Sequence, residues 1–130
     1  MPSSVHADLH CHSTISDGTL TPEDVARRAH ANGVTLTDHD EVAGQPRAAR
    51  AAAALGMDYL TGVEISVTFA DTTVHIVGLG FDADNAALVQ GLAATRDGRD
   101  ARGREMAAQL DAVGIHGAYE GAMRYAGNPA

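Results

Sequence analysis

Strands and helices alternate along the first two thirds of the chain, and this order restricts the folds open to it. Apolar stretches of strand length occupy residues 5–10, 34–40 and 57–66, and a helical pattern separates each from the next. An order of strand, helix, strand, helix, strand predicts parallel strands in one sheet, either open or closed into a barrel. We therefore expect an α/β fold.

The two expected helices carry recognisable end signals. Thr21 is predicted to be the N-cap of the first helix and Pro22 its first residue, with Asn32-Gly33 ending it. The second helix is an alanine-rich segment, residues 43–56. Both lengths suit the crossover connections that parallel strands require.

The rest of the chain begins with an expected hairpin at residues 66–81 that turns near Asp71. A helical pattern follows over residues 85–113. Gly98 and Gly103 weaken its middle, so one helix or two are both compatible with the pattern. The remaining tail has no clear pattern.

Composition excludes several classes of protein. The chain has 130 residues, of which 45% are hydrophobic and 20% charged, so one globular domain is expected. The formal net charge of −8 argues against binding to long duplex nucleic acid. The sequence shows no signal peptide and no apolar run long enough for a membrane. A single cysteine excludes an internal disulfide framework and favours the cytoplasm. The oligomeric state is not predicted.

Histidines two residues apart end the first predicted strand. Side chains at this spacing point to the same face, so Asp8, His10 and His12 are expected on one side. Leu9 and Cys11 are expected on the other, where Cys11 would pack as a small hydrophobe. Two imidazoles on one strand end indicate the start of a metal site.

Three further segments bring histidine or carboxylate to the same expected edge. These residues are Asp38, His39, Asp40, Glu64 and His75. Each segment alone has an ordinary interpretation, as a solvated loop, a buried carboxylate with a partner or a core histidine. Chemistry in parallel α/β folds gathers at the carboxyl ends of strands, however, and imidazole and carboxylate donors together suit Mn, Fe or Zn. The combination predicts a metal centre.

Four motifs in order resemble those of the PHP family (polymerase and histidinol phosphatase). They are DLHCHSTISDGTLTP, LTDHDEVAG, GVEIS and VHIVGLG. The chain is most similar to the stand-alone metal-dependent phosphoesterases of this family, which act on nucleoside 3′,5′-bisphosphates and short oligonucleotides. The resemblance implies a distorted (β/α)7 barrel. Residues 1–95 would form its amino-terminal part, and residues 96–130 would begin a helical insertion.

The resemblance also implies a trinuclear metal centre at the carboxyl-terminal face of the barrel. The implied ligands are His10, His12, Asp17, His39, Glu64 and His75. Glu64 would bridge two metals. We expect two or three divalent ions, with manganese first and iron or zinc as alternatives. Asp8, Asp38 and Asp40 are candidates for hydrogen bonds that orient the imidazoles, although a capping or solvated role is also open.

The chain departs from the family pattern at two places. Only VTLT stands between Gly33 and Asp38, so the second strand is short and its effect on His39 is open. The later ligands of the family are absent from these 130 residues. We therefore expect the chain to be the first part of a longer enzyme, and to be nearly inactive alone.

The activity that these inferences favour is hydrolysis of a phosphomonoester on a nucleotide by metal-activated water, so no catalytic side chain is assigned. The expected partner is a small phosphorylated substrate. Histidinol-phosphate hydrolysis, polymerase-linked exonuclease activity and a non-catalytic metal-binding module are the alternatives. Arg96, Arg99 and Arg102 recur every three residues. Interleaved acids favour a solvent-exposed, salt-bridged face for them over a phosphate-binding one.

Overall fold

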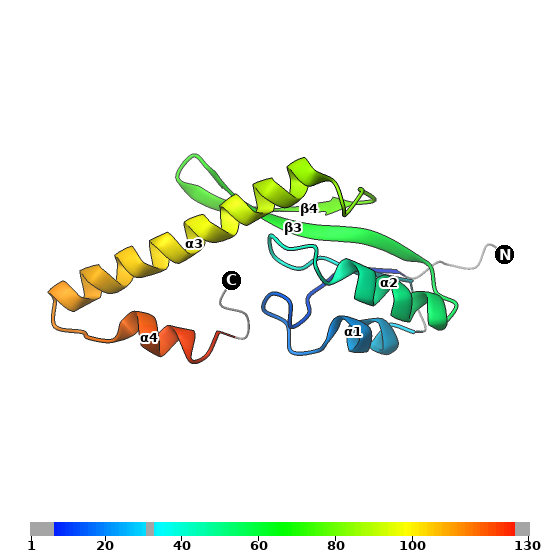
Figure 1. Cartoon of the computed structure of the whole chain (residues 1–130), viewed down its shortest axis with the longest axis horizontal. Helices are drawn as coiled ribbons and strands as arrows, with labels where there is room; N and C mark the ends of the chain where they lie inside the picture. The colour runs from blue at the N-terminus through cyan, green and yellow to red at the C-terminus, as the bar shows by residue number, and fades with distance from the viewer. Residues whose placement is uncertain (1–6, 31–32, 127–130) are drawn as a thin grey trace.

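Four strands form one sheet in the computed structural model, which describes residues 7–30 and 33–126 (Figure 1). The strands are β1 (Ala7–Cys11), β2 (Gly33–Leu36), β3 (Tyr59–Phe69) and β4 (Thr72–Leu79), in that order across the sheet. β1, β2 and β3 run parallel, and β4 pairs antiparallel with β3. The predicted parallel strands and the hairpin that follows them are confirmed.

Helix α1 (Pro22–Arg28) begins as predicted and ends earlier. The Thr21 hydroxyl accepts the backbone N–H of Asp24 at 3.2 Å, so Thr21 is the N-cap. The prediction that Asn32-Gly33 ends the helix is wrong, because the helix stops at Arg28 and Gly33 is the first residue of β2. Asn32 lies outside the described residues. Gly33 pairs with Ala7 of β1, so the chain must leave the helix before it reaches the predicted end signal at Asn32-Gly33.

The hairpin between β3 and β4 turns over two residues, as predicted near Asp71. Ala70 and Asp71 both have positive φ, at 48° and 60°. This left-handed backbone matches the twist of antiparallel strands joined by a two-residue loop. Residues other than glycine rarely adopt a positive φ, so this turn has a conformational cost.

The main core lies between the sheet and the helices α1 and α2 (Gln45–Ala54), which pack against each other. Its buried side chains are Val25, Ala26, Val34, Leu36 and Ala48. Cys11 packs against this cluster, as predicted for a small hydrophobe. Ala26 of α1 and Ala48 of α2 are both buried in this core, where the two helices meet.

A second, smaller core joins the sheet to helix α3 (Ala86–Ala112). Val42, Val63 and Leu92 are buried in it. The side chain of Asn85 caps α3 by accepting the backbone N–H of Leu88 at 3.1 Å. α3 is one continuous helix in spite of its glycines, which settles the choice between one helix and two.

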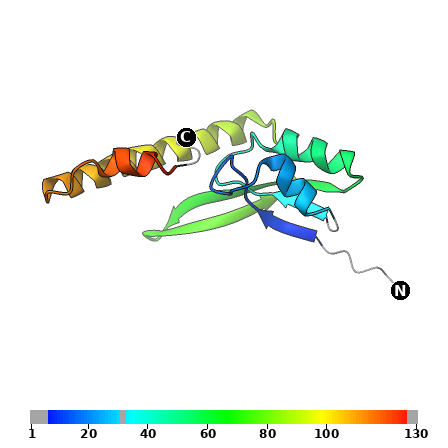
Figure 2. The same cartoon turned by 90° about the horizontal axis from the view of Figure 1, so that it is seen from below.

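Helix α4 (Ala118–Met123) was not anticipated from the sequence. It follows a loop over residues 113–117 and returns beside the carboxyl-terminal half of α3, where Figures 1 and 2 both show it. No helix in the described ranges is long and apolar enough to cross a membrane.

Candidate metal centre

The carboxylate of Glu64 lies at the centre of four imidazoles. Its Oε2 is 2.7 Å from Nε2 of His10 and 2.9 Å from Nε2 of His12. Nε2 of His39 lies 3.6 Å from the same oxygen, and Nδ1 of His75 lies 3.7 Å from Oε1. The four histidines come from β1 and its following loop, from the loop after β2 and from β4. A residue at the middle of β3 thus gathers side chains from three neighbouring segments.

Asp17 adds a second carboxylate to this cluster. Its Oδ1 lies 2.8 Å from Nδ1 of His12, and its Oδ2 lies 3.7 Å from Nε2 of His39. Three overlapping groups have donor atoms within 4.8 Å of one another: His10, His12 and Glu64; His12, Asp17 and His39; and His39, Glu64 and His75. The structure therefore brings all six sequence-predicted ligand candidates together.

Both carboxylates of the cluster are held in the ionised form. Burial raises the pKa of Glu64, but the hydrogen bond from His10 and the charges of His39, His10 and His12 outweigh it and lower the pKa overall. Burial also raises the pKa of Asp17. The hydrogen bond and the charge of His12 outweigh this effect, and the pKa of Asp17 is lowered overall. Two anions among four imidazoles make a set of donors suited to cations.

The environment of His39 fits a metal ligand. Its Nε2 faces two carboxylate oxygens at distances longer than a hydrogen bond, and its Nδ1 is buried without a partner among the described residues. The lone pair of a neutral imidazole lies on its unprotonated nitrogen, and Nε2, which faces the carboxylates, is the atom placed to donate it to a cation. The mixed nitrogen and oxygen donor set fits Mn, Fe or Zn.

The short β2 strand does not displace His39. Beyond Leu36 the pairing continues through backbone hydrogen bonds, from Glu64 N–H to the Asp38 carbonyl at 3.2 Å and from Asp40 N–H to the Glu64 carbonyl at 2.9 Å. His39 and Glu64 form an isolated parallel bridge. This local pairing sets His39 directly beside Glu64.

Asp38 organises the loop that carries His12 and Asp17. It is fully buried, and its carboxylate accepts hydrogen bonds from the Ser13 backbone N–H, the Ser13 hydroxyl and the Ser16 hydroxyl, each at 2.7 Å. Its partners are thus serines of the loop and not the imidazole proposed from the sequence. Ser13 and Ser16 are supporting residues of the site that the sequence analysis missed.

Asp8 also has a different environment from the one expected. The register between β1 and β2 is irregular between Asp8 and Cys11, which breaks the simple alternation of faces. The Asp8 carboxylate accepts the backbone N–H of His10 at 3.2 Å. Burial, together with the hydrogen bond and charge of Asp8, raises the pKa of the Cys11 thiol to about 12. Cys11 is therefore an uncharged packing residue.

Asp40 ties the metal-site loop to α3. It has a positive φ of 51°, its side chain is buried, and its carboxylate accepts the backbone N–H of Ser66 at 2.8 Å. Arg99 pairs with the same carboxylate, and Arg96 donates to the Asp40 carbonyl at 2.5 Å. Arg96 also pairs with Glu41 at 3.1 Å. Asp40, like Asp38, has partners other than the imidazoles.

The favoured interpretation of the arginines, a solvent-exposed salt-bridged face, holds only in part: Arg96 and Arg99 are salt-bridged and Arg99 is exposed, but the acids they pair with are not those interleaved on α3. Their partners are residues of the loop after β2, because the start of α3 packs over that loop and a buried carboxylate needs a cation. Both arginines line a cavity of about 650 Å³ beside His39 and His75. Positive charge therefore lies next to the candidate metal centre.

A family model described as the PHP domain matches residues 8–113. The chain belongs to the PHP family. It is 51% identical over 125 residues to a 3′,5′-nucleoside bisphosphate phosphatase of Chromobacterium violaceum, covering 94% of this chain and 44% of the relative. It is 43% identical over 122 residues to a 5′-3′ exoribonuclease of Haemophilus influenzae, covering 92% and 44%.

A solved structure supports the same assignment. An amidohydrolase from Chromobacterium violaceum, with bound sulfate and no metal, superposes with a TM-score of 0.83 at 50% identity. The match covers 95% of this chain and 45% of that one. The predicted fold class, an α/β fold of the PHP type, is confirmed. The chain spans less than half the length of these relatives.

Proposed function

We propose that His10, His12, Asp17, His39, Glu64 and His75 bind two or three divalent metal ions in the natural protein, with manganese preferred over iron and zinc. The three overlapping donor groups support this, since each ion could take ligands from one group. Glu64 belongs to two of the groups and could bridge two ions. His12 and His39 are likewise shared.

The activity we infer is hydrolysis of phosphomonoesters on nucleotides, with nucleoside 3′,5′-bisphosphates first and short oligonucleotides second. The observation that carries this is the convergence of six candidate donors in three overlapping groups, beside a cavity lined by Arg96 and Arg99. The names of the two relatives support the same choice of substrates.

Bound divalent ions would supply positive charge for the phosphoryl oxygens and activate the attacking water. The ionised carboxylates of Glu64 and Asp17 would hold those ions, and the imidazoles would complete their coordination. Asp38 fixes the loop of His12 and Asp17 through two serines. Arg96 and Arg99 add positive charge at the cavity wall, where a phosphate of the substrate would otherwise face the carboxylate of Glu41.

Phosphate release from a substrate panel tests the proposal. The intact natural protein, stripped with chelator and then reloaded with Mn²⁺, should release phosphate from adenosine 3′,5′-bisphosphate only after reloading. Short oligonucleotides should be cleaved under the same conditions. A wide preference for histidinol phosphate, or equal turnover with and without metal, would overturn the assignment.

We also propose a cytoplasmic location, on the evidence of the single cysteine, which is partly buried and not paired. The natural partner would be the small phosphorylated substrate. Fractionation of cells followed by immunodetection tests the location.

A further inference from the structure

A cleft of about 370 Å³ lies between α3 and α4. Its walls are formed by both helices, which run side by side in Figures 1 and 2. Arg96, Arg99 and Ala126 line this cleft and also line the cavity at His39 and His75. The two spaces therefore meet at the arginines, and one extended ligand could occupy both.

The cleft differs in chemistry from the cavity beside the metal centre. Its apolar wall residues include Met106, Ala107 and Leu110 from α3 and Ala122 and Met123 from α4. Met106 is 64% exposed and Leu110 is 38% exposed, so these side chains have little cover from the described part of the chain. An apolar wall that continues into a cationic junction suits a ligand with an apolar ring at one end and negative charge at the other.

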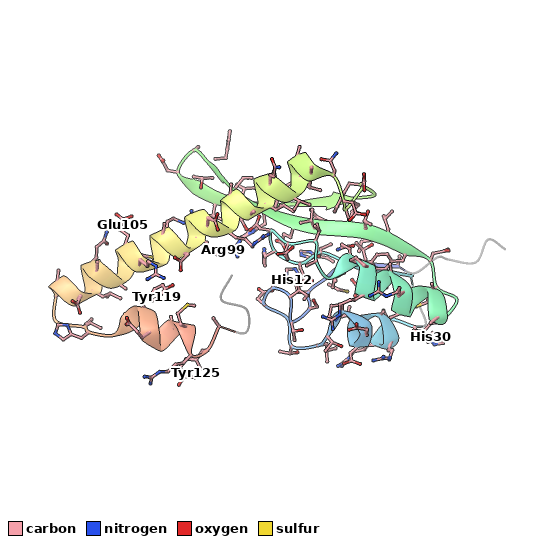
Figure 3. The ribbon with its side chains drawn as sticks, in the orientation of Figure 1. His12, His30, Arg99, Glu105, Tyr119 and Tyr125 are labelled. Carbon is pink, nitrogen blue, oxygen red and sulfur yellow. The ribbon has the colours of Figure 1, made fainter. Side chains whose placement is uncertain are left out.

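Tyr119 provides an aromatic surface in this cleft. Its hydroxyl donates to the Asp100 carboxylate, and the Arg104 guanidinium lies 4.3 Å from its ring centroid. Tyr119 lines two clefts. Arg104 lines the second of them together with Tyr119, but it does not line the α3–α4 cleft. The hydrogen bond and the guanidinium thus hold the ring in place between the two helices, where Figure 3 labels it.

We propose that the α3–α4 cleft binds the nucleobase of a nucleotide substrate, with Arg99 at the junction binding the phosphate that is not hydrolysed. The inference rests on the proposed function and adds a position for the base. Arg99 has a side chain that is 43% exposed and uses one terminal nitrogen for Asp40, so its guanidinium has surface left for a second anion. Planar bases bind to apolar and aromatic surfaces by stacking and burial, which is what the cleft offers.

The test fills the cleft without touching the metal centre. Ala107→Leu on α3 and Ala122→Leu on α4 each place a larger side chain in the cleft, and leucine is a good helix former. Ala101→Leu, at an exposed position of the same helix, is the matched control. Each is made in the intact natural protein loaded with Mn²⁺ and assayed on adenosine 3′,5′-bisphosphate and on ribose 5-phosphate, which has no base.

We expect both cleft variants to lose about tenfold or more in kcat/KM on the bisphosphate through a higher KM, equivalent to ~1.4 kcal/mol or more. Their turnover of ribose 5-phosphate should stay at the level of the control, which also shows that they fold. Equal effects on both substrates, or no effect on either, would overturn the inference. Equal losses of activity on the two substrates would mean that the cleft holds another segment of protein, whose displacement disturbs the enzyme whatever the substrate.

Binding of adenosine, followed by saturation-transfer NMR, separates this inference from the proposed function. Wild type and Ala101→Leu should bind the nucleoside, and the two cleft variants should not. Phosphate release without any difference in adenosine binding would leave the function standing and remove the cleft. Adenosine binding that the cleft variants lose, in a protein without phosphatase activity, would support the cleft and overturn the function.

Discussion

Nε2 of His12 lies 2.9 Å from Oε2 of Glu64, and this contact joins the loop after β1 to the middle of β3. A protonated imidazole could make the same contact with a carboxylate without any metal. A shared metal ion and a direct ion pair are therefore two explanations of the same contact. They predict different metal contents when the charge of Glu64 is removed and its shape is kept.

Glu64→Gln should weaken metal binding by about tenfold or more, because the neutral amide cannot balance the charge of the cations around it. Metal content after dialysis, measured by elemental analysis, checks this. Glu105→Gln is the matched control, at an exposed position of α3 that Figure 3 labels. Wild-type metal content and turnover in Glu64→Gln would show that Glu64 is not a ligand.

Removal of metal should destabilise the intact natural protein. A ligand that binds only the folded state adds about 2.7 kcal/mol of unfolding free energy when its concentration is 100 times its Kd. Thermal unfolding with chelator, and again after readdition of Mn²⁺, measures the difference. An unchanged Tm would contradict the metal centre, and Glu64→Gln should show a smaller shift than wild type.

Gly62 and Gly91 should respond in opposite directions to alanine. A Cβ on Gly62 would lie 2.2 Å from Thr35 Cγ2 and 2.7 Å from the Leu36 carbonyl, so Gly62→Ala should cost roughly 1–3 kcal/mol of stability. A Cβ on Gly91 would have nothing within 4 Å among the described residues, so Gly91→Ala should add about 1 kcal/mol through helix propensity. Urea unfolding of both variants checks the pair, and a stable Gly62→Ala would show that β2 and β3 are less closely packed than the structure has them.

The ion pair between Glu23 and Arg47 predicts a pH effect. Arg47 donates to both carboxylate oxygens at 2.7 and 2.8 Å and lowers the pKa of Glu23 to about 2, from 4.5. A depressed acid pKa stabilises the fold above the unfolded value, and this stabilisation is lost as pH falls from about 4.5 towards 2. Glu23→Gln should therefore lower Tm at neutral pH, with a difference that shrinks below pH 4.5.

Thermal unfolding of wild type and Glu23→Gln from pH 7 to pH 3 measures this difference. Glu105→Gln, made for the metal experiment, again serves as the control. A difference in Tm that stayed constant over this range would mean that the ion pair does not hold in solution.

The donors of the metal centre could be anticipated because their positions depend on local geometry. His10 and His12 lie at the end of the first strand, and Glu64 and His75 lie in the third strand and in the hairpin expected to follow it. A parallel sheet brings such residues to one edge whatever the details of packing. His39 is the exception, because its strand was expected to run further than β2 does.

The supports of the site could not be anticipated, because they depend on tertiary contacts. Nothing in the order of residues indicates that Asp38 would bind Ser13 and Ser16, or that Asp40 would pair with Arg99. The sequence favoured salt bridges between Arg99 and the acids beside it along the helix. The position of α3 over the loop after β2 gives Arg99 a different partner, although its side chain stays 43% exposed.

The attachment of α3 to the sheet and to the loop after β2 lies in its first half. Among the described residues of the helix, Leu92 is the buried one, and Arg96 and Arg99 make its ion pairs to the loop after β2. The far half of α3 and the whole of α4 can therefore change in sequence without disturbing the six donors. Evolution could exchange this outer part as a unit, so that related proteins keep one reaction centre while they diverge in the molecules they accept.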